Sequence, residues 1–148
     1  MGTSSFFSEE SIESRLRKAE EALGVLKKLA ELTFDEFASN LINVYAAKGA
    51  LLIISQVIID ISNLLIASKD LGVPTSREEV ISILESYEIL PEDIAEKLED
   101  LIKVRDKILH SHEIVGEKAL YEKILGNIEL LEKALGIIQK EIRSPSTG

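Results

Sequence analysis

The sequence predicts an all-α fold, an up-and-down bundle of about five antiparallel helices joined by short connections. Apolar residues recur every three or four positions over nearly the whole chain, which is the period of a helix and not of a strand. Few turn signals interrupt this pattern. The 148 residues suffice for one domain with its own core. We expect a flexible N-terminus over residues 1–8, the domain over 9–142, and a disordered tail over 143–148.

The first two helices follow from an apolar seam and a capping signal. Thr33 followed by Glu36 has the pattern of a capping box, which predicts that a second, long helix starts there and runs to about Asp70. In the first helix, apolar residues recur at alternating steps of four and three, opposite a charged face: Ile12, Leu16, Ala19, Leu23, Leu26 and Ala30.

Two breaks and a second seam define the remaining helices. After the break LGVPTS, Ser76 with Glu79 predicts another capping box and a short helix through about Tyr87. After EILPED, with Pro91 in first-turn position, a fourth helix runs to the two histidines. A last helix is expected over residues 117–142, on a seam of Leu120, Ile124, Ile128, Leu131, Leu135 and Ile138.

The composition excludes several classes of site. The chain has no cysteine and two histidines, so we expect no disulfide, no metal site and no cofactor. The net charge of −9 argues against a protein that coats nucleic acid non-specifically. It leaves room for an enzyme that binds one phosphate locally, or for a basic partner.

One helix in the middle of the chain is apolar enough to span a membrane but carries a polar line. The run Gly49–Ala67 contains Gln56, Asp60 and Asn63, and a carboxylate is costly in lipid. We therefore interpret it as a buried helix of a soluble, cytoplasmic protein with no membrane partner. Because the three polar residues are spaced four and three apart, they share one helix face. That face either meets solvent or faces a cationic group on another helix.

Arg105 supplies a candidate for that cationic group. On an ideal helix it lies near the centre of an apolar arc, with His112 almost beneath it and Asp106 and His110 as an i, i+4 pair on the flank. One interpretation is a structural ion pair between Arg105 and Asp60, with His110 at the helix C-terminus, where a cation suits the dipole. The other is that Arg105 faces a cleft or an oligomer interface.

The stretch RDKILH, Arg105 to His110, resembles the signature of HEPN-superfamily ribonucleases, an arginine followed after four to six residues by a histidine. Asp106 fits the polar residue that typically follows the arginine. From about Tyr45 to Ile142 the chain is similar to the HepT-like toxins, the partners of minimal nucleotidyltransferase antitoxins. This wider similarity includes QVIIDISNLLIA, GVPTSREEVISILESYEILPEDIAEKLEDLI and VRDKILHSH, in that order.

The resemblance implies a HEPN-like helical homodimer that cleaves RNA without a metal, in a cleft where two copies of the motif meet. It implies that Arg105 holds the scissile phosphate as a permanently charged fork, and that His110 activates the ribose 2′-hydroxyl or protonates the leaving oxygen. Asp106 would orient His110. The supporting residues of this expected site are Gln56 and Asp60, which would position Arg105, together with Asn63, Lys107 and His112.

One position departs from the family pattern. HepT toxins silenced by their antitoxin usually have a tyrosine two residues after the motif histidine, and the antitoxin transfers AMP to it; this chain has His112 there. Silencing would then come from simple binding, from another acceptor such as Tyr121, or not at all, and His112 could supply a second imidazole. Two alternatives to the ribonuclease remain: a non-catalytic module that binds nucleotides or docks onto a nucleotidyltransferase, and a purely structural bundle.

Overall fold

The computed structural model describes residues 9–110 and 115–144 of the chain. The expected N-terminal segment 1–8, His112 and most of the expected tail lie outside the described residues. The described part is all-α, as predicted, and contains no strand. Its helices are α1 (Glu9–Leu29), α2 (Phe34–Ala38), α3 (Leu41–Ser68), α4 (Arg77–Ser86), α5 (Glu92–His110), α6 (Glu117–Lys123), the 3-10 turn η2 (Leu125–Asn127) and α7 (Ile128–Arg143).

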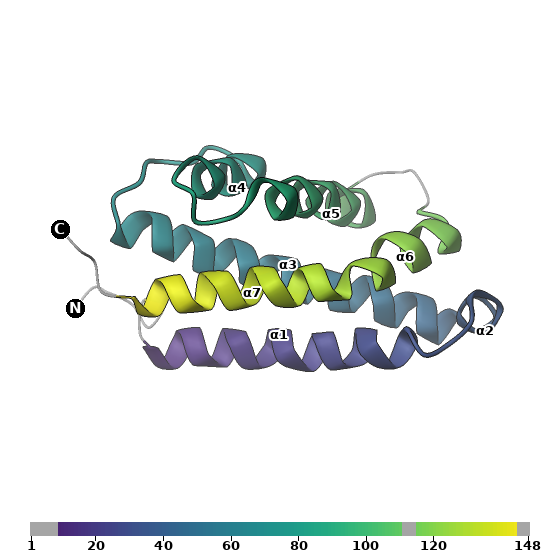
Figure 1. Cartoon of the computed structure of the whole chain (residues 1–148). Helices are drawn as coiled ribbons and strands as arrows, with labels where there is room; N and C mark the ends of the chain where they lie inside the picture. Colours follow the sequence, from purple (N-terminus) through teal and green to yellow (C-terminus); the bar gives the residue numbers. More distant parts are fainter. Residues whose placement is uncertain (1–8, 111–114, 145–148) are drawn as a thin grey trace.

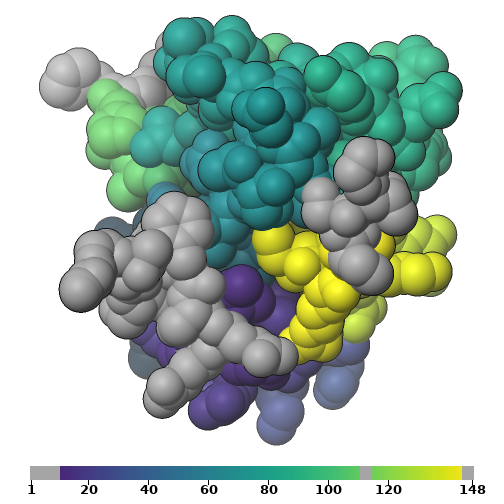
Figure 2. All heavy atoms as spheres, turned by 90° about the vertical axis from the view of Figure 1, so that its left-hand side faces the viewer, coloured from purple at the N-terminus to yellow at the C-terminus, as the bar shows by residue number. Residues whose placement is uncertain are grey.

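The long helix α3 runs through the middle of the bundle (Figure 1). α1 and α7 lie along one side of it, and α4 with α5 along the other. α2 and α6 close one end of the bundle. Figure 2 looks at the opposite end, where α4 and the last turns of α3 lie above α1 in purple and α7 in yellow. Every other α-helix of the described chain therefore packs directly against α3.

Burial of α3 explains why its sequence is so apolar. It is the one described helix long and apolar enough to cross a membrane, yet 67% of its most apolar 18-residue window is buried inside the protein. The neighbouring helices already cover that surface, as expected for a core helix that is apolar almost all round. Its C-terminus is closed by Asp70 in the left-handed region (φ 55°), with Leu71 N–H donating to the Ile66 carbonyl.

The prediction of one long second helix from Thr33 to Asp70 was wrong. The capping box is present, since Thr33 Oγ1 accepts from Glu36 N–H and the Glu36 carboxylate accepts from Thr33 N–H, but it starts only the five-residue α2. The chain then turns at Ser39, and Asn40 Oδ1 accepts a hydrogen bond of 2.9 Å from Ile42 N–H to begin α3. The second N-cap makes the chain change direction within an otherwise helical pattern.

The predicted last helix is also interrupted. α6 ends at Lys123, and the backbone tightens into a 3-10 turn over Leu125–Asn127 before α7 begins. Asn127 Nδ2 donates to the Lys123 carbonyl at 2.6 Å, which satisfies an acceptor released by the break. Ser76 is confirmed as the N-cap of α4, but the predicted capping box is incomplete, because the Glu79 carboxylate accepts from Thr75 N–H. α5 begins directly after Pro91.

Candidate functional site

Arg105 lies on α5 with its side chain buried against α3. Arg105 is only 5% exposed to solvent, and it is the only charged residue of the described chain buried to this extent. Nη2 donates to Gln56 Oε1 at 2.8 Å and Nη1 donates to Asp106 Oδ1 at 3.0 Å. Nε is buried without a hydrogen-bond partner within the described residues. Removing a cation from water is costly to the fold when its hydrogen bonds, as here among the described residues, are incomplete.

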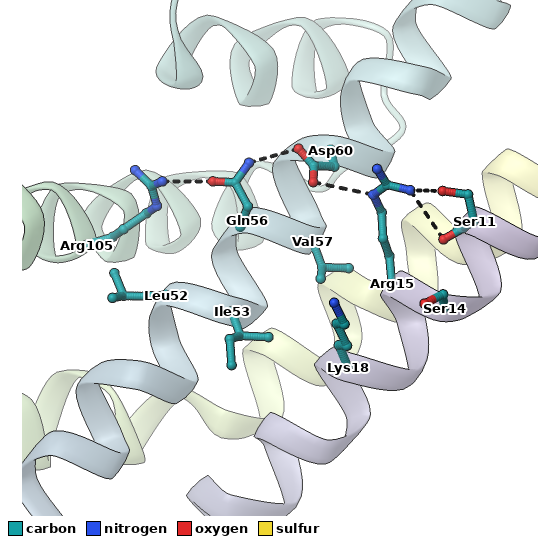
Figure 3. Close-up of a pocket in the computed structure, with 10 residues that line it drawn as sticks. All are labelled: Ser11, Ser14, Arg15, Lys18, Leu52, Ile53, Gln56, Val57, Asp60 and Arg105. Atoms are coloured by element: carbon teal, nitrogen blue, oxygen red, sulfur yellow. Dashed lines mark hydrogen bonds and ion pairs between the residues drawn. The ribbon is translucent and has the colours of Figure 1, made fainter. Parts of the chain in front are cut away.

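Arg105 is the first member of a relay that crosses three helices (Figure 3). Gln56 Nε2 donates to Asp60 Oδ1 at 2.8 Å, and Asp60 Oδ2 pairs with Arg15 Nε at 3.5 Å. Arg15 Nη1 donates in turn to the side chain and the carbonyl of Ser11. An amide suits the Gln56 position because it can accept from the cation while donating to the carboxylate. The relay thus links α5, α3 and α1.

The relay borders two hollows in the surface. The larger, of about 800 Å³, lies between α1 and α3 and includes Arg105 at its edge; it is lined by Ser11, Ser14, Arg15, Lys18, Leu52, Ile53, Gln56, Val57, Asp60 and Arg105 (Figure 3). The smaller, of about 360 Å³, lies between α3 and the start of α4, and Asn63 and Arg77 line it. The polar line on α3 therefore meets solvent and also faces cations on other helices, so both interpretations of it hold in part.

The direct ion pair expected between Arg105 and Asp60 is replaced by the Gln56 bridge. Asp60 pairs with Arg15, a residue to which the sequence analysis gave no role. Ser11, Arg15 and Lys18 follow one another at helical spacing beside the apolar seam of α1, and this spacing was the available signal. In the sequence, these polar residues of α1 could not be distinguished from an ordinary charged, solvent-facing helix surface.

His110 does not join the relay within one copy of the chain. It is the last residue of α5, its side chain is exposed, and it does not line the larger hollow. Five helical residues correspond to a rotation of about 140°, so His110 and Arg105 leave α5 on different faces. Asp106 Oδ1 accepts from Arg105 and lies 4.0 Å from Arg77 Nη1. Lys107 is exposed on α5. The joint action of His110 with Arg105, and its orientation by Asp106, stay predictions.

Tyr121, the alternative acceptor for AMP, has a structural place. Its hydroxyl donates to the Leu32 carbonyl at 2.6 Å. Its ring packs against Phe34 and Phe37 with centroids 5.5 and 5.4 Å away. The hydroxyl is therefore already engaged in joining α6 to the α1–α2 connection.

The larger hollow is lined by three cationic side chains and one carboxylate. Across residues 9–110 and 115–144, no three histidine, aspartate or glutamate side chains gather as a metal ion would require. Arginine and lysine nitrogens in a partly enclosed hollow instead suit an anion, and a planar guanidinium suits a phosphate in particular.

Comparison with known proteins places this chain in a family. The sequence profile described as "Ribonuclease HepT-like" matches residues 19–138, which include the polar line on α3 and the RDKILH stretch. The chain belongs to the HepT-like ribonuclease family. This HepT-like chain matches no curated protein sequence.

Solved structures share the fold of this HepT-like chain. A tri-AMPylated HEPN toxin of Shewanella oneidensis in complex with MNT antitoxin is 14% identical, with a TM-score of 0.80 over 90% of this chain and 99% of the other. A toxin–antitoxin crystallised with AMP-PNP is also 14% identical, with a TM-score of 0.76 over 88% and 99%. YutE of Bacillus subtilis, described as a cytosolic protein of unknown function, is 20% identical, with a TM-score of 0.76 over 90% of both chains. These likenesses confirm the HEPN-like fold.

Proposed function

We propose that the chain is a HepT-like toxin, a metal-independent endoribonuclease whose composite Arg/His site forms between two copies. The observation that carries the proposal is the placement of Arg105. Within the family motif, its guanidinium is held by Gln56 and Asp106 beside a hollow in which cationic side chains outnumber carboxylates. Such a preorganised fork suits the developing charge of a phosphate under attack.

The proposed chemistry needs a proton carrier beside that fork. The ribose 2′-oxygen forms a bond to phosphorus while the bond from phosphorus to the 5′-oxygen breaks. His110 takes the proton from the 2′-hydroxyl or gives one to the leaving oxygen. Arg105 holds the non-bridging oxygens of the same phosphate. Protein side chains supply all of these steps.

A second copy of the chain would bring His110 close to an Arg105. Within one copy the two side chains diverge by about 140° around α5. The exposed face of α3 that carries Gln56 continues toward its N-terminus with large apolar side chains: Ile42 is 74% exposed and Tyr45 66%. Leu109, next to His110, is 45% exposed. An apolar face of this kind beside the motif favours a homodimer.

The proposed protein partner is a minimal nucleotidyltransferase antitoxin. The proposal rests on the family and on the HEPN toxin of similar fold in complex with MNT antitoxin. With His112 in the usual tyrosine position, and with the Tyr121 hydroxyl bonded to Leu32, silencing by simple binding fits this chain best.

RNA cleavage by the purified chain in EDTA tests the enzymatic part of the proposal. We expect the wild type to cleave single-stranded RNA, and His110→Ala and Arg105→Leu each to lose at least about a hundredfold in rate, the usual range for general acid–base catalysis. Lys103→Ala is the matched control, because Lys103 is exposed on the same helix and does not line the larger hollow. Undiminished cleavage by both site variants would refute the assignment.

Mixing the two inactive variants tests whether two copies share one site. A mixed dimer of Arg105→Leu with His110→Ala retains one intact arginine and one intact histidine on different chains. Partial recovery of cleavage after the dimers are exchanged is expected for a composite site. The alternative, a docking or nucleotide-binding module, predicts tight binding to a nucleotidyltransferase partner and no cleavage by any form of the isolated chain.

A further inference from the structure

The larger hollow is cationic although the chain is acidic. The full sequence has 26 aspartates and glutamates against 17 lysines and arginines. The lining of the hollow reverses this balance, with Arg15, Lys18 and Arg105 against the single carboxylate of Asp60. Of these cations only Arg105 belongs to the family motif. The positive charge of the hollow therefore comes from α1, through Arg15 and Lys18, as well as from α5. A local reversal of this kind selects an anionic ligand.

α1 contributes one face to this hollow. Ser14, Arg15 and Lys18 follow Ser11 by three, four and seven residues, so all four lie along the same side of the helix. Opposite them stand Gln56 and Asp60 of α3 (Figure 3). The relay places Arg15 at its far end from Arg105, with Asp60 and Gln56 between the two guanidinium groups.

Lys18 has no other engagement in the described structure. It forms no hydrogen bond or ion pair with any described residue, and its side chain is exposed. Arg15, in contrast, is bound to Asp60 and Ser11. Lys18 lines the hollow one helical turn from Arg15 (Figure 3). Of the two α1 cations that line the hollow, Lys18 is thus the one available to a ligand.

We propose that Lys18 binds a phosphate of the RNA strand next to the scissile one, so that the hollow between α1 and α3 is a second backbone subsite. The inference rests on the proposed ribonuclease function and extends its site from α5 to α1. Arg15 acts as a positioning residue, because it fixes Asp60 and through it the Gln56 amide that holds Arg105. The apolar floor of Leu52, Ile53 and Val57 between the cations suits the face of a base or ribose.

Binding of an uncleavable strand tests this subsite without relying on turnover. The probe is a fluorescent single-stranded 2′-O-methyl RNA of about 12 nucleotides, a length in the usual range of single-strand sites. We expect Lys18→Gln to weaken its binding about fivefold at low salt, as for one exposed charge contact. The slope of log affinity against log salt should flatten by about 0.7, the loss expected for one phosphate contact on a single strand.

Lys28→Gln is the matched control, because Lys28 is an exposed lysine of the same helix that does not line the hollow. It changes the net charge equally and is expected to leave affinity and slope as in the wild type. Equal effects of the two variants, or none from Lys18→Gln, would overturn the subsite while RNA cleavage by the wild type still upheld the proposed function. A changed oligomeric state in Lys18→Gln would also overturn it. A wild type that neither binds nor cleaves RNA would remove both proposals.

Discussion

At the scale of single residues, Arg105 is a buried cation whose hydrogen bonds within the described chain are incomplete. Its guanidinium is removed from water, yet Nε has no partner within the described chain. Its two anchors, Gln56 and Asp106, are themselves exposed or half-buried and could be solvated without it. Desolvation of the cation is therefore only partly offset by its hydrogen bonds.

Replacing Arg105 by leucine should separate stability from activity. Arg105→Leu removes the desolvation cost and keeps an apolar side chain at the site, so we expect the free energy of unfolding to rise by about 1 kcal/mol. Cleavage should be lost. Urea unfolding gives the first quantity and an RNA assay the second.

Arg105→Ala serves as the comparison, because it also removes the cation but leaves the space unfilled, which should lower stability by about 2 kcal/mol. If the leucine variant were destabilised as much as the alanine variant, the hydrogen bonds of Arg105 would be holding the fold.

Sequence reasoning identified the special residues here but not all of their partners. The periodicity placed Arg105 in an apolar arc and aligned Gln56 with Asp60, and the structure brings these three residues into one relay. The periodicity did not predict that Arg105 would donate to Gln56 instead of pairing with Asp60, or that Asp60 would pair with Arg15. Both depend on how neighbouring helices slide along one another, and local periodicity says nothing about that register.

At the scale of elements, the predicted helices are present but two of them are divided. The capping signals at Thr33, Ser76 and Pro91 marked real starts. The N-cap Asn40 was missed because the apolar period continues across it, and the break before α7 was missed because the seam resumes immediately. A capping residue inside a continuous pattern acts only when tertiary packing favours a change of direction there.

The role of Asn40 as an N-cap can be measured directly. Asn40→Ala removes the acceptor for Ile42 N–H at the start of the core helix, so stability should fall by about 1 kcal/mol. Thermal and urea unfolding would report the loss. Asn63→Ala replaces an exposed asparagine inside the C-terminal part of the same helix and should leave stability unchanged or slightly raised, because alanine is the better helix former. Equal stability of both variants with the wild type would show that the cap is not needed.

At the scale of the whole molecule, the bundle is closed at one end by a contact between distant parts of the sequence. Tyr121 on α6 bonds to the carbonyl of Leu32, 89 positions earlier, and packs on the two phenylalanines of α2. No pattern within a single helix reveals such a contact. The packing of a second copy of the chain, on which the proposed site depends, is equally beyond a one-chain pattern.

The hydroxyl of Tyr121 should contribute measurably to stability. Tyr121→Phe keeps the ring packing but leaves the half-buried Leu32 carbonyl without its donor, so the free energy of unfolding should fall by about 1 kcal/mol. Tyr87→Phe is the control, since Tyr87 is 55% exposed. Chemical denaturation of both variants would decide, and an unchanged midpoint for Tyr121→Phe would show that water replaces the tyrosine without loss.

The two halves of the proposed site differ in how firmly the scaffold holds them. Arg105 stands within α5, anchored across to a neighbouring helix, whereas His110 occupies the helix's final residue. Terminal turns fray at free energies well below that of global melting. On gentle warming, His110 would therefore be displaced while Arg105 still held the phosphate. RNA cleavage would then decline at temperatures below global unfolding at which the RNA strand is still bound.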